Sequence, residues 1–255
     1  AGANPEILVE HHPHIGTFKL ATVVRGLRAR IEALGGEIRF QSQVVDLDLA
    51  GNGEGGQRIL GVILADGERI AADQVVLAVG HSARDTFTML RDRGVAMEVK
   101  PFAIGVRIEH PQPMIDRVRW GGACGHPRLG AAEYKLVHHC SNGRTVYSFC
   151  MCPGGLVVGA TSEEGRVVTN GMSQHTRNER NANSGIVVGI DQRDVAPYGD
   201  GPDDPLAGVA FQRHWEAQAF QRGGGSYAAP AQRVGDFLAR RPSAPVTNAT
   251  ATPEE

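Results

Sequence analysis

The stretch DQVVLAVGHSARDT, from Asp73 to Thr86, joins a short apolar run to the start of a helical pattern. The run from Val75 to Val79 has the length of a strand and is rich in β-branched residues, and Gly80 ends it. Helical spacing begins at Ser82, a favoured N-cap residue. The sequence therefore predicts a strand, a glycine turn and a helix, an arrangement that lets a backbone approach a phosphate or a flat cofactor. An ordinary strand-to-helix turn fits the same pattern.

Composition places the chain among globular proteins and argues against several kinds of partner. Its 255 residues are 41% hydrophobic and 21% charged, with a net charge of −2 and no basic block, which argues against binding nucleic acid. No apolar run is long enough to span a membrane, and the N-terminus lacks the profile of a signal peptide. Only 4 cysteines favour a reducing compartment over a disulfide framework, so we expect a cytoplasmic protein.

Two short patterns near the ends of the chain are better explained without a metal or glycosylation site. The segment HHPHIG, His11 to Gly16, suits either an exposed loop or, less often, a metal site. The glycosylation triplet at Asn248 is read as chance, because no secretion signal accompanies it. The tail from residue 242 to 255 is expected to be disordered. The chain begins with alanine rather than methionine, so we expect it to be processed or cut from a longer protein.

Periodicity predicts helices and strands along most of the chain. The clearest helix begins at Thr17, its expected N-cap, and Gly35 and Gly36 end it. GNGEGG, residues 51–56, matches a dinucleotide-binding expression, but a strand pattern follows it, so it is read as a hairpin loop. Helices are expected at 17–34, 82–93, 111–119, 206–222 and 234–238. Strands are expected at 37–40, 44–49, 59–64, 68–71, 101–110, 133–138, 145–152, 156–160, 166–169 and 185–190.

The pattern changes near residue 100, from mixed helices and strands to a glycine-rich series of strands. We expect a first domain over 1–99, a mostly antiparallel β lobe inserted over 100–205, a helical return segment over 206–241 and a tail over 242–255. The fold class is therefore α/β with an inserted α+β lobe.

Several motifs, in order along the chain, resemble one family. They are HPHIGT (12–17), LGGEIRFQSQVVDL (34–47), LAVGHSARDT (77–86), KPFAIGVRIEHPQ (100–112), LGAAEYKL (129–136), YSFCMCPGG (147–155), TNGMS (169–173) and PAQRVGDFL (230–238). Together they resemble the bacterial FAD-dependent dehydrogenases of the glutathione-reductase-like flavoprotein class, which are mostly uncharacterised. The resemblance implies a partial FAD/NAD(P)-binding Rossmann-like domain carrying a substrate lobe. Such flavoproteins also have a true G-x-G-x-x-G turn at the start and a second FAD segment at the end, and both are absent here. We therefore expect an internal fragment, for which autonomous FAD binding is an open question.

The resemblance also implies which residues contact FAD. The backbone of Val44 is expected to pair with the adenine edge, and Ala78, Gly80, His81 and Ser82 are expected to approach the cofactor from another side. Glycine suits such a place because a Cβ would hold the cofactor away. The alternatives are a core valine at 44, a loop histidine at 81 and a solvated first helical turn at Arg84 and Asp85.

The strand YSFCMCPGG is the expected lining of the flavin's reactive side. Alternation predicts Tyr147, Phe149 and Met151 on one face and Ser148, Cys150 and Cys152 on the other. The turn Pro153, Gly154 and Gly155 is expected to expose N–H groups to the flavin or a substrate.

Cys150 and Cys152 are weak catalytic candidates, because two buried, inert cysteines on a strand fit the C-x-C spacing better than redox-active thiols do. The spacings of the cysteines and histidines match no zinc pattern, so no metal site is predicted.

The polar stretch 169–183 either lines a substrate cleft, through Asn170, Ser173 and His175 above all, or is an exposed loop. Arg107, Glu109 and Lys135 lie on expected strands beside these motifs, as site charges or as surface residues.

The function predicted for the parent protein is FAD-dependent oxidation or reduction of an unknown small molecule, with NAD(P)H or another electron donor. The alternatives are a non-catalytic domain fragment without autonomous FAD binding and, less favoured, a thiol or zinc module.

Overall fold

The chain divides into two compact units, which are described separately. Unit 1 contains residues 1–33, 101–191 and 212–255, and unit 2 contains residues 34–100 and 192–211. The structure is a computed structural model, and it describes residues 2–9, 13–51 and 56–246. The predictions for His11, His12, the loop 52–55, the glycosylation triplet and the end of the tail therefore lie outside the described residues.

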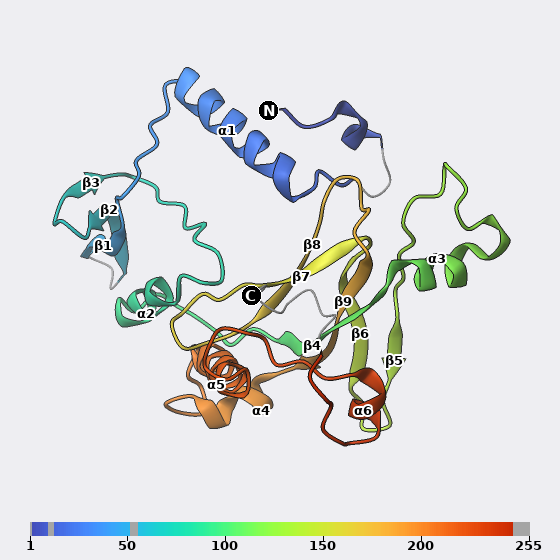
Figure 1. Cartoon of the computed structure of the whole chain (residues 1–255). Coiled ribbons are helices and arrows are strands. Elements are labelled where there is room, and N and C mark those ends of the chain that lie inside the picture. The colour runs from blue at the N-terminus through green and yellow to red at the C-terminus, as the bar shows by residue number, and fades with distance from the viewer. Residues whose placement is uncertain (1, 10–12, 52–55, 247–255) are drawn as a thin grey trace. The chain divides into compact units, whose positions relative to one another are not determined.

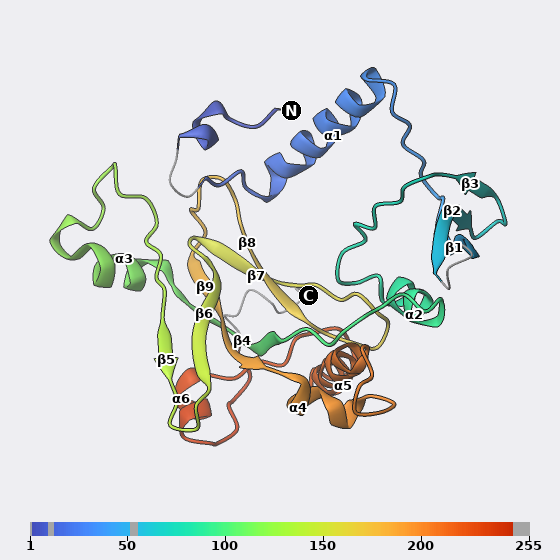
Figure 2. The ribbon, with the colours of Figure 1, turned by 180° about the vertical axis from the view of Figure 1, so that it is seen from behind.

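Unit 1 is built on a four-stranded antiparallel sheet with the order β4-β9-β6-β5. The strands are β4 (Phe102–Pro111), β5 (Val137–His139), β6 (Thr145–Cys152) and β9 (Asn181–Ile190), accompanied by a two-stranded hairpin of β7 (Gly155–Gly159) and β8 (Thr169–Ser173). Figures 1 and 2 show the hairpin beside β9 from both sides. The long pairing of β4 with β9 brings together segments that are far apart in the sequence.

The helices of unit 1 lie before, between and after these strands. They are α1 (Thr17–Ala33), α3 (Gln112–Trp120) and α6 (Val234–Leu238), with single 3₁₀ turns at Pro5–Leu8 and Gly121–Ala123. The division between the units crosses α5 (Ala207–Arg222), whose later part belongs to unit 1. There the Arg213 guanidinium forms a bidentate ion pair with Glu163, which fixes the helix against the loop after β7.

Unit 2 contains a three-stranded antiparallel sheet in the order β1-β2-β3. Its elements are β1 (Val44–Gly51), β2 (Gln57–Leu64), β3 (Arg69–Ala71), α2 (Arg84–Asp92), α4 (Gln192–Val195) and a 3₁₀ turn at Ala196–Tyr198. The Gly67 N–H donates to the Leu64 carbonyl at 2.9 Å, which confirms the predicted hairpin turn. Strands β1 and β2 pair antiparallel, with Gly51 opposite Gln57.

Four predicted strands differ from the structure. Val75–Val79 forms no strand and pairs with none among the described residues, and Val76 is 89% exposed, so the predicted strand is wrong there. The predicted strand at 37–40 is also not formed. Strand β8 begins at Thr169, where the prediction of 166–169 ended. Strand β5 covers only Val137–His139, where a strand was predicted at 133–138. In each case the strand depends on a partner segment, which local periodicity does not identify.

The first long helix, α1, has its predicted bounds to within one residue, but its apolar stripe is not buried. Thr17 is the first helical residue rather than the cap, and Gly16 precedes it with a positive φ of 86°. No residue of α1 is buried. Its apolar stripe is open instead, with Leu20, Leu27 and Ile31 all about half exposed.

The observed architecture is α+β with antiparallel sheets, which confirms the expected antiparallel lobe. All strand pairs among the described residues are antiparallel, so the Rossmann-like part stays a prediction. None of the helices within 2–9, 13–51 and 56–246 has the length and apolarity needed to cross a membrane.

Candidate functional site

The turn after β6 is the centre of a buried hydrogen-bond network in unit 1. Pro153, Gly154 and Gly155 are all buried, and the Gly154 N–H donates to Gln112 Oε1 at 2.7 Å. Gln112, itself only 5% exposed, also donates from Nε2 to Asp116 Oδ1 at 2.7 Å and to the Ala132 carbonyl at 3.1 Å. The prediction that this turn exposes its N–H groups is therefore wrong for Gly154, because a side chain from α3 already occupies that donor.

The turn is also tied to the loop that follows β8. Gly154 has a φ of 45°, and a Cβ there would collide with the backbone carbonyl of Arg177. The Glu179 N–H donates to the Gly154 carbonyl at 3.3 Å, and the Ser173 hydroxyl donates to the Pro153 carbonyl at 2.9 Å. Glycine is required at 154 by both conformation and space, so this contact positions the loop.

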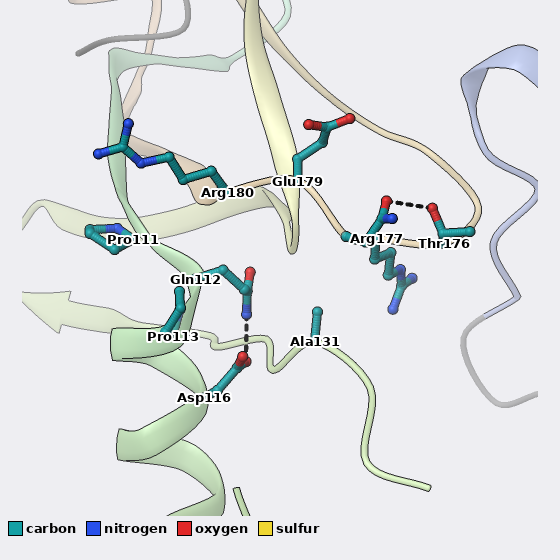
Figure 3. A pocket seen from close by; sticks show the side chains of 10 residues that line it. Pro111, Gln112, Pro113, Asp116, Ala131, Thr176, Arg177, Glu179 and Arg180 are labelled. Atoms are coloured by element: carbon teal, nitrogen blue, oxygen red, sulfur yellow. Dashed lines mark hydrogen bonds between the residues drawn. The ribbon is translucent and has the colours of Figure 1, made fainter. Parts of the chain in front are cut away.

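A pocket of about 620 Å³ opens beside this network, entirely within unit 1. The end of β4, the start of α3 and the loop after β8 line it through Pro111, Gln112, Pro113, Asp116, Ala131 and residues 176–180. Figure 3 shows Gln112 between Arg180 on one side and Arg177 on the other, with its amide directed at Asp116. The pocket therefore lies where a strand end, a helix start and a loop meet.

Two cations of the pocket have no partner among the residues that the structure describes. The guanidinium groups of Arg177 and Arg180 form no hydrogen bond or ion pair within the described part of the chain, whereas Glu179 accepts from Gln174 at 2.9 Å and Asp116 accepts from Gln112 and the Ala132 N–H. Arg177 has a φ of 49°, an unfavourable backbone conformation for a non-glycine residue. Unpaired guanidinium groups beside partly satisfied carboxylates suit a polar ligand that carries an anionic group.

Strand β6 loses its regular register just before the turn. The pairing with β9 shifts between Phe149 and Cys152, and Cys150 has a φ of 50°. As a result Cys150 is exposed whereas Cys152 is 8% exposed, so the predicted placement of both thiols on one regular strand face is wrong. A bulge, which adds a residue to one strand, is the physical reason.

Arg107 connects this bulge to the neighbouring strand. Its Nη1 donates to Asn183 Oδ1 at 2.6 Å and to the Cys150 carbonyl at 3.3 Å. Burial raises the pKa of the Cys152 thiol, the nearby Cys150 raises it further, and the Arg107 charge opposes both. Arg107 thus joins the bulge of β6 to Asn183 of β9, and its role as a site charge stays a prediction.

His110, near the end of β4, and Tyr134, in the segment before β5, form a second polar pair. Their side chains are joined by a 2.7 Å hydrogen bond between His110 Nε2 and the Tyr134 hydroxyl, with the rings edge to face. Burial lowers the pKa of His110 below its ordinary value of 6.5, and the neighbouring Glu109 carboxylate opposes that shift. Burial also raises the pKa of the Tyr134 hydroxyl, so the pair is held neutral at physiological pH.

The three predicted substrate residues lie in different environments. Asn170 is exposed and its side chain accepts from the Gly171 N–H at 2.8 Å, whereas Ser173 is buried against Pro153. His175 is exposed, and its Nδ1 lies 3.1 Å from the His14 carbonyl. None of the three lines the pocket, whose loop residues begin at Thr176. Their role in substrate binding stays a prediction.

The residues predicted to contact FAD from the first part of the chain lie in unit 2. Val44 begins β1, an edge strand whose outer side pairs with no other strand in the described residues. Ala78, Gly80, His81 and Ser82 are all exposed, and the space where a Gly80 Cβ would stand is empty to 4 Å. Gly80 has a φ of 74°, so a glycine is favoured there. A free strand edge and an open glycine turn are compatible with a flat cofactor.

Ser82 is not the N-cap of the following helix. Helix α2 begins at Arg84, with Ala83 at the cap position and no side-chain cap hydrogen bond. The Ser82 hydroxyl instead lies 3.3 Å from His81 Nε2. Asp85 is in the first helical turn as predicted, and it accepts from Gln43 at 3.3 Å.

Sequence reasoning missed Gln112, Asp116 and Arg180 as parts of a site. Gln112 follows a strand and precedes Pro113, a local pattern that indicates a helix start but no burial. Its partner Gly154 is 42 residues away, so only tertiary structure reveals the contact. Within the described residues, no group of three or more His, Cys, Asp or Glu side chains is placed to share a metal ion.

Comparison with known proteins gives the chain a family. An uncharacterised protein of Clostridium beijerinckii (strain ATCC 51743 / NCIMB 8052) is 47% identical over 244 residues, which cover 95% of this chain and 44% of that protein. The chain thus spans less than half of the curated relative it matches. A family model described as "FAD-dependent protein, C-terminal domain-like" matches residues 101–254, which hold the pocket, the turn after β6 and the Arg107 cluster. The chain belongs to this family of FAD-dependent proteins.

Proposed function

We propose that the chain is part of an FAD-dependent oxidoreductase that acts on a polar small molecule. Family membership over residues 101–254 is the observation that carries the proposal. When FAD is bound, it supplies the hydride or electron chemistry, and the protein binds and orients the substrate. NAD(P)H or another donor is the expected source of electrons.

The proposed FAD contacts are Val44, Ala78, Gly80, His81 and Ser82. The free edge of β1 and the open, left-handed Gly80 support this part of the proposal. Contact of the flavin with Pro153, Gly154 or Gly155 stays a prediction, with the Gly154 N–H unavailable to it.

A matched pair of glycines tests the proposed FAD contact. Gly80 and Gly94 share a φ of 74°, both are exposed, and at neither would a Cβ meet another atom within 4 Å. FAD is titrated onto the purified chain and onto the variants Gly80→Val and Gly94→Val, with quenching of flavin fluorescence as the readout. The proposal predicts saturable binding that Gly80→Val abolishes and Gly94→Val preserves. Equal binding by both variants would remove Gly80 from the site.

The pocket beside Gln112 is the proposed substrate-binding pocket, with Arg177 and Arg180 as the groups that bind an anionic part of the substrate. Their guanidinium groups support this role, because neither has a partner within the described part of the chain. Succinate and inorganic phosphate are suitable probes, followed by NMR of the arginine side chains. Arg177→Ala is expected to weaken binding at least about tenfold, since a charge-assisted contact contributes about 1.5–3 kcal/mol. The exposed Arg128, which lies outside the pocket, supplies the control Arg128→Ala.

A second candidate function is a non-catalytic part of a longer protein, with no FAD binding of its own. The open apolar stripe of α1 favours it, because such a stripe is normally covered by other polypeptide. The Clostridium beijerinckii relative extends beyond the matched region, which is consistent with this second candidate function. The FAD titration separates the two candidates, because only the first predicts binding by this chain alone.

A further inference from the structure

Cys150 and Cys152 stand at the bulged end of β6 with one residue between them. Cys150 is exposed and Cys152 is buried, although both lie within the same strand. In a regular extended strand the two Cβ atoms would stand about as far apart as the two Cα atoms, roughly 6.6 Å, which exceeds the roughly 4.5 Å that a disulfide allows. A bond between the two sulfurs therefore depends on the irregular backbone that the strand has at Cys150.

The backbone at Cys150 is held in a conformation that cysteine disfavours. Its φ of 50° lies in the left-handed region, where a side chain costs about 1–2 kcal/mol relative to the right-handed region. Glycine or asparagine would occupy such a position at lower cost. Residues kept in unfavourable conformations cluster at functional sites, so a cysteine here indicates a use for its thiol.

The surroundings of the pair are fixed and polar rather than a plain apolar core. Cys152 Sγ lies 3.5 Å from the Cys150 carbonyl, which also accepts from Arg107. Gly171 faces the cluster, where a Cβ would stand 2.8 Å from Cys152 Sγ. Asn183 is fully buried beside them, and its Nδ2 has no partner among the described residues. The Cys152 sulfur therefore lies directly beside the backbone of Cys150.

We propose that Cys150 and Cys152 form a dithiol–disulfide site that reacts with small disulfides. The Cys150 thiolate attacks one sulfur of the disulfide, forming a mixed disulfide and releasing one thiol. The Cys152 sulfur then loses its proton and attacks Cys150 Sγ, which breaks the mixed disulfide and releases the second thiol. In total the protein dithiol is oxidised to one intramolecular disulfide and the small disulfide is reduced to two thiols.

The order of the two steps follows from exposure. An incoming disulfide reaches Cys150 at the surface, whereas Cys152 is only 8% exposed. Burial raises the pKa of Cys152, so it remains a thiol until the mixed disulfide forms beside it. The proposal does not depend on flavin binding and is tested without FAD.

The experiment uses reduced wild-type chain, oxidised glutathione, an alkylating quench, trypsin and mass spectrometry. Cleavage at the arginines and lysines isolates the pair in the peptide 145–166, while Cys124 and Cys140 fall in the separate peptides 120–128 and 136–144. The proposal predicts that peptide 145–166 loses two hydrogen atoms and carries no glutathione, while the exposed Cys124 takes up glutathione singly. A peptide 145–166 that keeps both thiols, or that ends as a stable glutathione adduct, would overturn the proposal.

Serine variants assign the two roles. Cys152→Ser is expected to accumulate glutathione on Cys150 at least about tenfold above wild type, because the neighbouring thiol normally acts at high effective concentration. Cys150→Ser is expected to leave Cys152 unmodified, and Cys124→Ser to leave the disulfide unchanged. Equal adduct levels in wild type and Cys152→Ser would contradict the second step. The glutathione experiment on the wild-type chain uses no variant, so misfolding of a variant cannot hide its result.

Discussion

Gln112 holds the buried turn after β6, and replacing it with alanine should strongly destabilise unit 1. Its side chain makes three hydrogen bonds, to Gly154, Ala132 and Asp116. Alanine would leave the Gly154 N–H and the Ala132 carbonyl without their partners, although both residues are buried. Each orphaned group costs about 1–3 kcal/mol, so the free energy of unfolding should fall by about 3 kcal/mol.

The assay is urea unfolding followed by tryptophan fluorescence. The two tryptophans, Trp120 and Trp215, both belong to unit 1, so the signal reports on that unit. With a denaturant slope of about 2 kcal/mol/M, the loss corresponds to a midpoint about 1.5 M lower. Gln221→Ala is the matched control, because Gln221 is exposed on α5 and should change stability by less than about 0.5 kcal/mol. A shift no larger than that control would refute the role given to Gln112.

Three further predictions concern the turn and two titrating groups. Gly154→Ala should lower the free energy of unfolding by at least about 3 kcal/mol in the same urea assay, because the new Cβ meets the Arg177 carbonyl. The control Gly143→Ala has a φ of 82° and open space around the new Cβ, so it should lower the free energy of unfolding by about 1 kcal/mol. Equal losses in the two variants would contradict the contact between position 154 and Arg177. Stability should fall as pH drops through about 6.5, because burial lowers the pKa of His110 in the folded state and the unfolded state then binds the extra proton. His110→Asn should flatten that part of the pH profile, and an unchanged slope would count against it. Arg93→Ala should raise the pKa of Asp46 toward its ordinary value of 3.8, because the hydrogen bond from Arg93 lowers that pKa. An NMR titration of the Asp46 carboxyl that showed no change would exclude this interaction between Arg93 and Asp46.

Local pattern predicted the elements whose signal lies within a few residues. The apolar repeat of α1, the hairpin at Gly67 and the regularly paired part of β6 up to Phe149 all appear where the sequence places them. Such signals depend on helix period, turn chemistry and strand alternation, each of which is local. The antiparallel lobe around β4, β6 and β9 was accordingly predictable as a class.

Features set by distant partners were not predictable. Val75–Val79 has strand composition but no strand partner in the described structure, and the open face of α1 shows that an apolar stripe need not be covered within the chain. The left-handed Cys150 and the burial of Gln112 depend on β9 and Gly154, which are far away in sequence. The candidate site was therefore foreseen as a region, through YSFCMCPGG, but not as a set of contacts.

FAD binding by this chain is tested most directly by a visible absorption spectrum of the purified chain after FAD is added and unbound FAD is removed by desalting. We predict retained flavin bands at close to one FAD per chain, with Gly80→Val losing them and Gly94→Val keeping them. A colourless chain after desalting would contradict FAD binding by this polypeptide, and would favour its role as a non-catalytic part of a longer flavoprotein.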